Sequence, residues 1–173
     1  MKKILTILFS FLLCSCSSPQ LSDYANTTPV FKFEDFFNDK LVAYGIVFDR
    51  SGTMTRHFSV DINATWQGNK GTIDEQFIFN DGEKSERIWH IIKRDNGIYE
   101  GTASDVVGIA QGKINGSVLT WQYQLMITVD GTEYEVTLDD WMYMLDSNRL
   151  FNKTDIIKFG LKMGEVILYI EKQ

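Results

Sequence analysis

The chain has 173 residues, with 17 Lys and Arg against 23 Asp and Glu, 44% hydrophobic and 13% aromatic residues, and two cysteines. A chain of this length predicts one domain with a sizeable core, and its apolar content excludes a disordered protein. The formal net charge of -6 argues against a nucleic-acid binder, and two cysteines are too few for a disulfide-rich scaffold or a cysteine-based zinc site.

The N-terminus has the order of a bacterial secretory signal. Two lysines precede an apolar run over residues 4–13, which small residues follow. The run is too short to span a bilayer, which requires about 20 apolar residues. Residues 13–16 read Leu-Cys-Ser-Cys and resemble the lipobox at which lipoprotein signals are cleaved. We therefore expect residues 1–15 to be a signal peptide that is cut before Cys16.

By that resemblance, Cys16 receives acyl chains such as palmitate and anchors the protein to a membrane. Ser17 follows, and a residue other than aspartate here resembles the outer-membrane sorting signal of diderm bacteria. The expected location is the inner leaflet of the outer membrane, facing the periplasm, and the expected partners include the lipoprotein processing and sorting machinery. Residues 16–30 are expected to form the lipidated cysteine and a flexible polar tether. An ordinary cleaved signal with an incidental cysteine is the alternative.

Alternation of apolar and polar residues predicts a single β-domain over residues 31–173. In Met54–Trp66 the even positions are apolar except for Arg56, and the odd positions are polar. Leu119–Val129 repeats the pattern, and glycine-containing turn signals separate such stretches. The aromatic-rich segment Phe31–Phe37 is expected to form a short plug or helical turn under the domain. We predict an all-β antiparallel meander of about nine or ten strands that closes into a lipocalin-like barrel, with a sandwich as the alternative.

Turn positions predict the register of neighbouring strands, because a two-residue loop fixes which residues face each other. With a loop at Asp130–Gly131, Trp121 faces Asp140. With a loop at Asn115–Gly116, Ala110 faces Trp121. Small residues then lie on the inner face opposite large ones, namely Gly108, Ala110 and Gly112 opposite Tyr123, Trp121 and Leu119.

Two further positions need special turn or strand geometry. A hairpin with the odd loop Asp81–Glu83 keeps its two faces in phase, and it places Glu75 opposite Trp89 and one diagonal step from Arg87. The apolar alternation slips at Trp141, which falls on the polar phase. We expect a β-bulge there, because bulges re-aim side chains.

The alternation places four ionisable residues on the inner face, namely Arg56, Glu75, Arg87 and Asp140. A charge there is costly unless it is paired or hydrogen-bonded. Glu75 and Arg87 are predicted to lie within reach of an ion pair. One interpretation is a polar floor that orients the head of an amphipathic ligand, and the other is a set of charges paired for satisfaction alone. The candidate ligand-binding residues are Arg56, Glu75, Arg87, Trp89, Trp121, Tyr123 and Asp140.

Signals for catalysis are weak. His57 and His90 lie on polar faces without a second His or Cys at ligand spacing, so neither a metal site nor a cofactor is expected. The adjacent carboxylates Asp139 and Asp140 point to opposite faces of a strand and cannot easily act as one acid–base pair. The sequence also lacks a nucleophile elbow and a phosphate-binding loop. We expect a protein that is not an enzyme; catalysis would require the inner charges to converge in an open cleft.

A series of short motifs runs through the domain. It comprises Phe36-Phe37, Leu41–Gly45, Asp49–Gly52, Trp66–Gly68, Gly71–Phe77, Asp81–Glu83, Arg87, Trp89, Tyr99–Ala103, Asp105–Gly108, Asp139–Tyr143, Lys158–Gly160 and Gly164-Glu165. Their order over about residues 31–172 resembles an uncharacterised family of bacterial lipoproteins, a domain of unknown function often encoded beside cyclopropane-fatty-acid-synthase-like enzymes. The resemblance implies an envelope setting, a link to membrane-lipid modification and a lipocalin-like barrel, and it brings no catalytic residues.

The leading functional hypothesis is a lipid-anchored periplasmic barrel that binds a hydrophobic or amphipathic ligand, such as a fatty-acyl lipid. The alternative is a non-enzymatic envelope scaffold or accessory protein with a filled core, for which the outward-phase Val107 and Ile109 are candidate contact residues. An empty apolar volume of about 300 Å³ or more favours the ligand, and a densely packed interior favours the scaffold.

Overall fold

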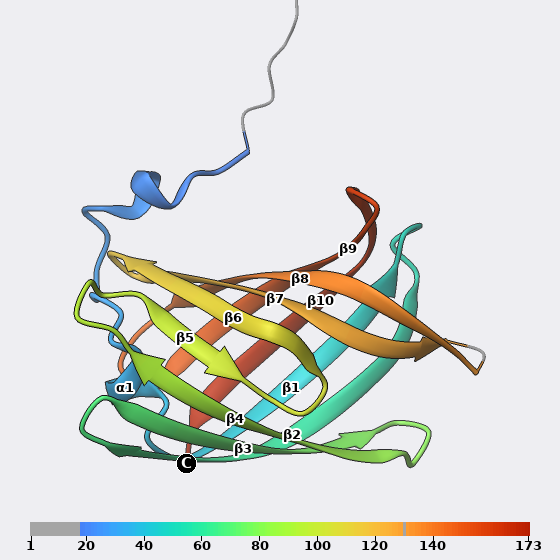
Figure 1. The fold of residues 1–173 in the computed structure, drawn as a ribbon, viewed down its shortest axis with the longest axis horizontal. Helices are drawn as coiled ribbons and strands as arrows, with labels where there is room; N and C mark the ends of the chain where they lie inside the picture. The colour runs from blue at the N-terminus through green and yellow to red at the C-terminus, as the bar shows by residue number, and fades with distance from the viewer. Residues whose placement is uncertain (1–17, 130) are drawn as a thin grey trace, which may run out of the picture.

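The computed structural model describes residues 18–129 and 131–173, and within them the chain folds into a closed barrel of ten antiparallel strands (Figure 1). The expected signal peptide, Cys16 and Ser17 lie outside the described residues. The elements are η1 (Leu21–Tyr24), α1 (Phe33–Phe36), β1 (Asp39–Asp49), β2 (Met54–Gln67), β3 (Lys70–Phe79), β4 (Lys84–Lys93), β5 (Tyr99–Thr102), β6 (Val106–Asn115), β7 (Val118–Val129), β8 (Thr132–Met144), β9 (Arg149–Lys158) and β10 (Leu161–Lys172). Each strand pairs with its neighbours in sequence, and β10 pairs with β1. The predicted meander is confirmed, and its closure selects the barrel over the sandwich.

The strands have one face toward the barrel interior and one toward solvent. On β2, Val60, Ile62 and Ala64 are buried, whereas Asp61 and Asn63 between them are exposed. This period of two is what a half-buried strand requires, because successive side chains point to opposite faces. The alternation in the sequence therefore predicted the core side of the strand correctly.

Glycines on the inner face make room for large aromatic side chains. Gly45 faces Phe58 between β1 and β2, and Gly112 faces Trp121 between β6 and β7. A Cβ atom would lie 2.3 Å from Phe58 Cζ at the first position and 2.4 Å from Trp121 Cε3 at the second. Any larger residue at either position would overlap the facing ring, so small residues opposite large ones are a packing requirement of this barrel.

The predicted register between β6 and β7 is wrong, because the two-residue loop lies one residue later in the chain than predicted. Gly116 and Ser117 form the two-residue loop, and Trp121 consequently faces Gly112 instead of Ala110. Gly116 has a φ of +54°, which suits the first position of a glycine-led hairpin turn. Gly108 is exposed rather than on the inner face, because the β6 register shifts around it and its φ is +76°.

The β3–β4 hairpin also closes one residue earlier than predicted, so the loop is not Asp81–Glu83. Gly82, with a φ of +87°, takes the last of the three loop positions, where such hairpins need a left-handed residue. As a result, Glu75 faces Arg87 directly instead of Trp89.

The register between β7 and β8 is confirmed, with Trp121 facing Asp140. The expected bulge at Trp141 is not present, because the pairing of β8 with both β7 and β9 runs through this residue without a shift. Trp141 is instead an outward-facing residue of a regular strand.

The segment Phe31–Phe37, here called the plug, closes one end of the barrel and includes α1 (Figure 1). Its Glu34 carboxylate accepts a hydrogen bond from the Tyr99 hydroxyl at 2.6 Å. The indole N–H of Trp66 donates to the Phe37 carbonyl at 2.7 Å. The buried side chains of the plug are Phe31, Phe33, Phe36 and Phe37. The expected aromatic plug is therefore confirmed.

Residues 18–30 lie against the barrel instead of extending freely as the tether expected from the sequence. Thr27 Oγ1 accepts a hydrogen bond from the Ser117 N–H at 2.9 Å, and the Tyr24 ring packs 6.1 Å from that of Trp141. This segment covers the outer face near the ends of β6–β8 (Figure 1). The cover explains why a tryptophan is placed on the polar phase without a bulge.

Candidate functional site

A cavity of about 130 Å³ lies inside the barrel next to the plug. Aromatic rings form much of its wall, and they come from Phe37, Phe58, Phe77, Trp89, Trp121 and Tyr123. Trp89 stands edge-to-face against both Trp121 and Tyr123, with ring centroids 5.6 and 5.2 Å apart. The volume is below the roughly 300 Å³ of a pocket for a drug-sized ligand.

Polar side chains interrupt this apolar wall. Asp140 and Asn152 are 4% and 6% exposed, and each has a buried oxygen, Oδ1, without a hydrogen-bond partner. Glu75 is half-buried as a residue, but its Oε2 atom is fully buried and also lacks a partner. A buried acceptor left in this state costs about 1–3 kcal/mol. The cavity therefore combines an apolar wall with three oxygen atoms that have unused hydrogen-bonding capacity.

The two carboxyl groups at the cavity have unusual proton affinity. Burial raises the pKa of Glu75 to about 7, against the opposing effects of the Arg87 charge and of the Trp89 indole. Burial also raises the pKa of Asp140 to about 7, although a hydrogen bond from Thr154 favours the charged form. Desolvation is the largest cause in both cases. Both groups consequently titrate near neutral pH.

Arg87 is engaged by a residue outside the predicted set. Its Nε and Nη2 atoms donate to Asp105 Oδ2 at 2.9 and 2.7 Å, and Asp105 lies in the loop before β6. The Arg87 Cζ atom is 5.7 Å from the ring centroids of both Phe77 and Trp89. Glu75 faces Arg87 across the strand pair but forms no ion pair among the described residues. The expected Glu75–Arg87 pair is thus replaced by Arg87–Asp105.

Arg56 lies apart from the other candidate residues. Its Nη2 atom is 2.9 Å from Asp81 Oδ2 and 2.6 Å from Glu83 Oε2, and its guanidinium stacks 3.6 Å above the Phe79 ring centroid. These partners belong to the β3–β4 turn and the end of β3, far along the strand from Glu75. The structure therefore gathers six of the seven candidates near the cavity and leaves Arg56 at the barrel rim.

Three polar residues of the site were not predicted, namely Asp105, Asn152 and Thr154. Asn152 donates from Nδ2 to Thr154 Oγ1 at 3.2 Å, and both are buried on the inner face of β9. The sequence contains only a weak signal that Asn152 and Thr154 face inward. On β9, the alternate positions Leu150, Asn152 and Thr154 are as polar as the positions between them. Asp105 lies in a loop, and alternation assigns no direction to a loop side chain.

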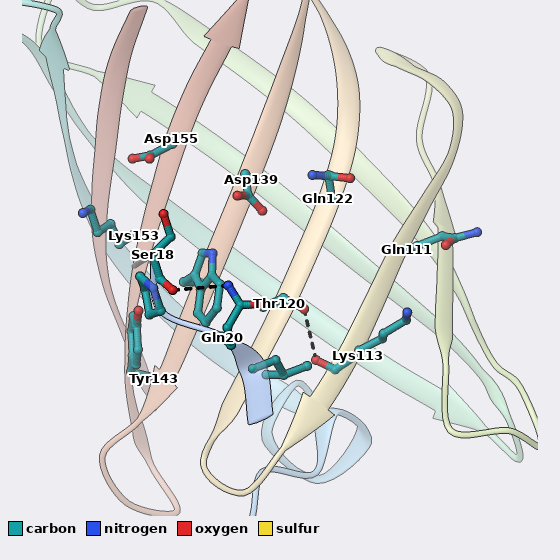
Figure 2. Close-up of a pocket in the computed structure, with 13 residues that line it drawn as sticks. Ser18, Gln20, Gln111, Lys113, Thr120, Gln122, Asp139, Tyr143, Lys153 and Asp155 are labelled. Atoms are coloured by element: carbon teal, nitrogen blue, oxygen red, sulfur yellow. Dashed lines mark hydrogen bonds between the residues drawn. The ribbon is translucent and has the colours of Figure 1, made fainter. Parts of the chain in front are cut away.

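A second hollow, of about 640 Å³, lies on the outer face between residues 18–21 and strands β6–β9 (Figure 2). Its lining is polar around the ring of Trp141, with Gln122 and Lys153 on neighbouring strands. Asp139 and Asp155 face each other across β8 and β9, and burial raises the pKa of Asp139. None of the predicted site residues lines this hollow, because the sheet separates it from the interior.

An apolar patch covers the outer face of β1, β9 and β10. Tyr44 faces Tyr169, which in turn faces Phe151, and Ile46 faces Ile167. All five are exposed or half-buried, and we call this set the outer apolar patch. The predicted contact residues Val107 and Ile109 are also exposed, on β6.

The described part of the chain gives no further site of a standard type. Neither of the helices in residues 18–129 and 131–173 is long and apolar enough to cross a membrane. Among these residues, no group of three or more His, Cys, Asp or Glu side chains is placed to hold a metal ion.

Comparison with known proteins gives a family and no assigned activity. No curated protein and no solved structure matches the chain. A family model described as a protein of unknown function (DUF3833) matches residues 10–172, which include every strand of the barrel. The chain therefore belongs to the DUF3833 family of proteins of unknown function.

Proposed function

We propose that the protein is a non-enzymatic binding protein that holds a hydrophobic or amphipathic molecule inside its barrel. The cavity beside the plug carries this proposal, because unpaired oxygens of Glu75, Asp140 and Asn152 lie in an aromatic and apolar wall. An apolar pocket with a few convergent polar groups is the usual form of a small-molecule site, in which the polar groups fix orientation.

The inner face is apolar between the cavity and the barrel end opposite the plug, and we call this stretch the apolar route. The inward-phase residues along it are Phe77, Phe79, Leu125, Ile127 and Val136. Glu75 and Phe79 are four positions apart on β3, or about 13 Å at ~3.3 Å per residue. Both described helices lie toward the other end (Figure 1). This layout supports a ligand with its polar head beside Glu75 and its chain directed outward.

The cavity volume of about 130 Å³ is below the roughly 300 Å³ expected for a whole ligand, so the proposal requires a ligand divided into two parts. About 130 Å³ is enough for a head group but not for a whole acyl lipid. The chain of a fatty-acyl molecule would therefore occupy the half-exposed apolar end, in contact with Phe79 and Ile127. A lipid with a fatty-acyl or alkyl chain is the class of ligand that we propose.

Native mass spectrometry of the full-length protein, purified from a bacterial envelope and then extracted with organic solvent, tests the binding function. We expect a stoichiometric lipid that leaves the protein upon extraction. A clean apo mass, with no uptake from a panel of fatty acids and phospholipids, would refute the proposal.

We also propose that Cys16 carries the lipid anchor and that the protein resides in the periplasmic leaflet of the outer membrane. The order of charge, apolar run and lipobox-like residues supports this. Incorporation of a palmitate analogue should be lost in Cys16→Ser and kept in the matched control Cys14→Ser, with the labelled protein in the outer-membrane fraction. Equal labelling of both variants, or none in the wild type, would contradict the assignment.

The alternative function is an envelope scaffold, and the outer apolar patch favours it. Tyr44 and Phe151 are 54% and 43% exposed, and neighbouring apolar residues make the patch continuous across three strands. A photo-crosslinker at position 44 should capture a discrete partner in cells, whereas one at the exposed polar position 61 on β2 should not. Equal patterns from the two positions would argue against the scaffold.

A further inference from the structure

We infer that the head group held in the barrel is a cation of the alkylammonium class, bound between the carboxylates of Glu75 and Asp140 and the aromatic walls. The inference rests on the proposed function, since it names the chemistry of the ligand at the same cavity. Hydrogen-bonding capacity, charge, aromatic surface and volume each support it.

The fully buried atoms of the cavity that lack a hydrogen-bond partner are all oxygens that can accept. The atoms without partners are Glu75 Oε2, Asp140 Oδ1 and Asn152 Oδ1. A carboxylate or phosphate head brings only further acceptors and would leave these oxygens unsatisfied. A primary ammonium brings three N–H donors and no acceptor, as the lysine side chain does. Donor supply therefore favours an ammonium head.

The charge of the site points the same way. Arg87 is the positive charge that acts on both Glu75 and Asp140, and its Nε and Nη2 atoms donate to Asp105. When ionised, Glu75 and Asp140 are therefore two buried negative charges without a cation of their own. A fatty carboxylate could form a two-nitrogen pair with the Nε and Nη2 atoms of Arg87 only by displacing Asp105, which would leave that carboxylate unpaired. A cationic head compensates the site without breaking an existing pair.

The aromatic walls add surface that attracts cations. A cation is stabilised over the faces of Trp, Tyr and Phe rings within about 6 Å of the centroid. Trp89 stands edge-to-face to Tyr123 and Trp121, so the rings present faces in more than one direction. Arg87 already shows this preference, with Cζ 6.0 Å from the Tyr123 ring centroid.

The enclosed space suits a small head group. At about 30 Å³ per water molecule in the liquid, 130 Å³ corresponds to about four waters. A primary ammonium with its first methylene groups fits this space, while the rest of the chain follows the apolar route past Phe77.

Matched ten-carbon probes test the inference on the full-length protein. Decylammonium, decanoate and decanol share one chain and differ only in the head, and quenching or shift of tryptophan fluorescence reports binding because Trp89 and Trp121 line the cavity. We expect decylammonium to bind at least about ten-fold more tightly than either comparator. Decanoate binding as tightly as decylammonium would overturn the inference.

Substitutions of the two carboxyl groups locate the head. Glu75→Gln and Asp140→Asn should each weaken decylammonium binding about ten-fold while leaving decanol affinity unchanged. Glu86→Gln, at an exposed position of β4, is the matched control and should behave as wild type. Unchanged decylammonium affinity in both cavity variants would refute the assigned site.

The pH dependence of wild-type binding provides a test that needs no variant. Decylammonium affinity should rise between about pH 5.5 and 8 as the two carboxyls lose their protons, whereas decanol affinity should stay flat. An affinity for decylammonium that is independent of pH over this range would count against the carboxylates as its partners.

The outcomes separate the inference from the function on which it rests. If decanoate or decanol binds best, the barrel is still an amphiphile-binding protein and only the cationic head is refuted. If no probe binds, both proposals fall, and the cavity holds ordered water only. If methylammonium binds but decylammonium does not, the cation site stands and the amphiphile function fails.

Discussion

Arg87 and Asp105 are joined by two nitrogens of one guanidinium, although Glu75 is the residue that faces Arg87 across the strands. The pair links β4 to the loop before β6. The partly exposed Asp105 side chain limits its contribution, and we expect Asp105→Asn to lower the free energy of unfolding by about 1–3 kcal/mol. Urea denaturation measures this, with Asp81→Asn at the exposed rim as the control. An equal loss of unfolding free energy in Asp81→Asn would show that the burial of the Arg87–Asp105 pair is not the cause of the effect.

The same variant should change the ligand preference of the cavity. With Asp105→Asn, Arg87 loses its anionic partner and becomes available to Glu75 or to an incoming carboxylate. We expect decanoate binding to appear or to strengthen by about ten-fold, and decylammonium binding to weaken. Fluorescence titration with both probes measures this reversal. A variant with the wild-type order of affinities would mean that Arg87 does not exclude anionic heads.

Stability should depend on pH through the two buried carboxyls. Their folded-state pKa values, about 7, lie above the ordinary values of 4.5 for Glu75 and 3.8 for Asp140, so the folded state binds more protons between these limits. Their contribution to stability is fully present below about pH 4 and is lost as the pH rises through about 7. We expect the wild-type Tm to fall between about pH 5 and 8 relative to that of the double variant Glu75→Gln, Asp140→Asn. Parallel Tm curves for the two proteins would refute the titration.

The close approach of Gly45 to Phe58 predicts that one methyl group added at position 45 would strongly disturb the packing of the barrel interior. A Cβ at Gly45 meets three atoms of the Phe58 ring within 2.7 Å. Gly45→Ala should therefore cost about 1–3 kcal/mol of unfolding free energy. In a Phe58→Leu background most of that cost should disappear, which a double-mutant cycle by chemical denaturation will measure. Additive losses would show that the methyl group disturbs something other than the ring.

Docking of residues 18–30 depends on Thr27, whose hydroxyl accepts from the Ser117 N–H and donates to the Tyr24 carbonyl. Thr27→Val removes both bonds, and also the bond that the Thr27 hydroxyl accepts from the Ser117 hydroxyl, while keeping the side-chain shape. We expect hydrogen exchange of the Ser117 amide to accelerate by about ten-fold or more, since a bond of about 1 kcal/mol or more is lost. Asn26→Ala, at an exposed neighbouring position, should leave exchange unchanged. Protection retained in Thr27→Val would mean that the other contacts of the segment, such as Tyr24 packing and the Asn115–Leu21 bond, are enough to hold it.

The parts of the fold that the sequence predicted are those controlled by local rules. Alternation placed Val60 and Ile62 in the core, and the two-residue loop before β8 set Trp121 opposite Asp140. The other two hairpins were each displaced by one position, because the glycine that tolerates a positive φ occupies one particular place in each loop type. A sequence pattern gives the turn but not which of its positions the glycine takes.

The parts of the site that the sequence did not predict depend on contacts distant along the chain. Asp105 reaches Arg87 from a loop, and only the folded structure shows that its carboxylate and not that of Glu75 completes the pair. Trp141 looked like the mark of a bulge because alternation cannot show that Tyr24, far earlier in the chain, covers it. The position of Arg56 at the rim follows from the length of β2 and the place of the β3–β4 turn.

If Cys16 carries the proposed lipid, the docked N-terminal segment limits the distance between the barrel and the membrane. If the fourteen residues 17–30 were a free linker, they could extend up to about 45–50 Å. The domain could then move and rotate independently of the membrane. With Ser18 already on the barrel wall, a lipid on Cys16 would be separated from that wall by two residues, at most about 7 Å. That is about the depth of one head-group layer. With that anchor, the barrel would lie at the bilayer surface, and the proposed ligand would be exchanged at the lipid–water boundary instead of being carried across the periplasm.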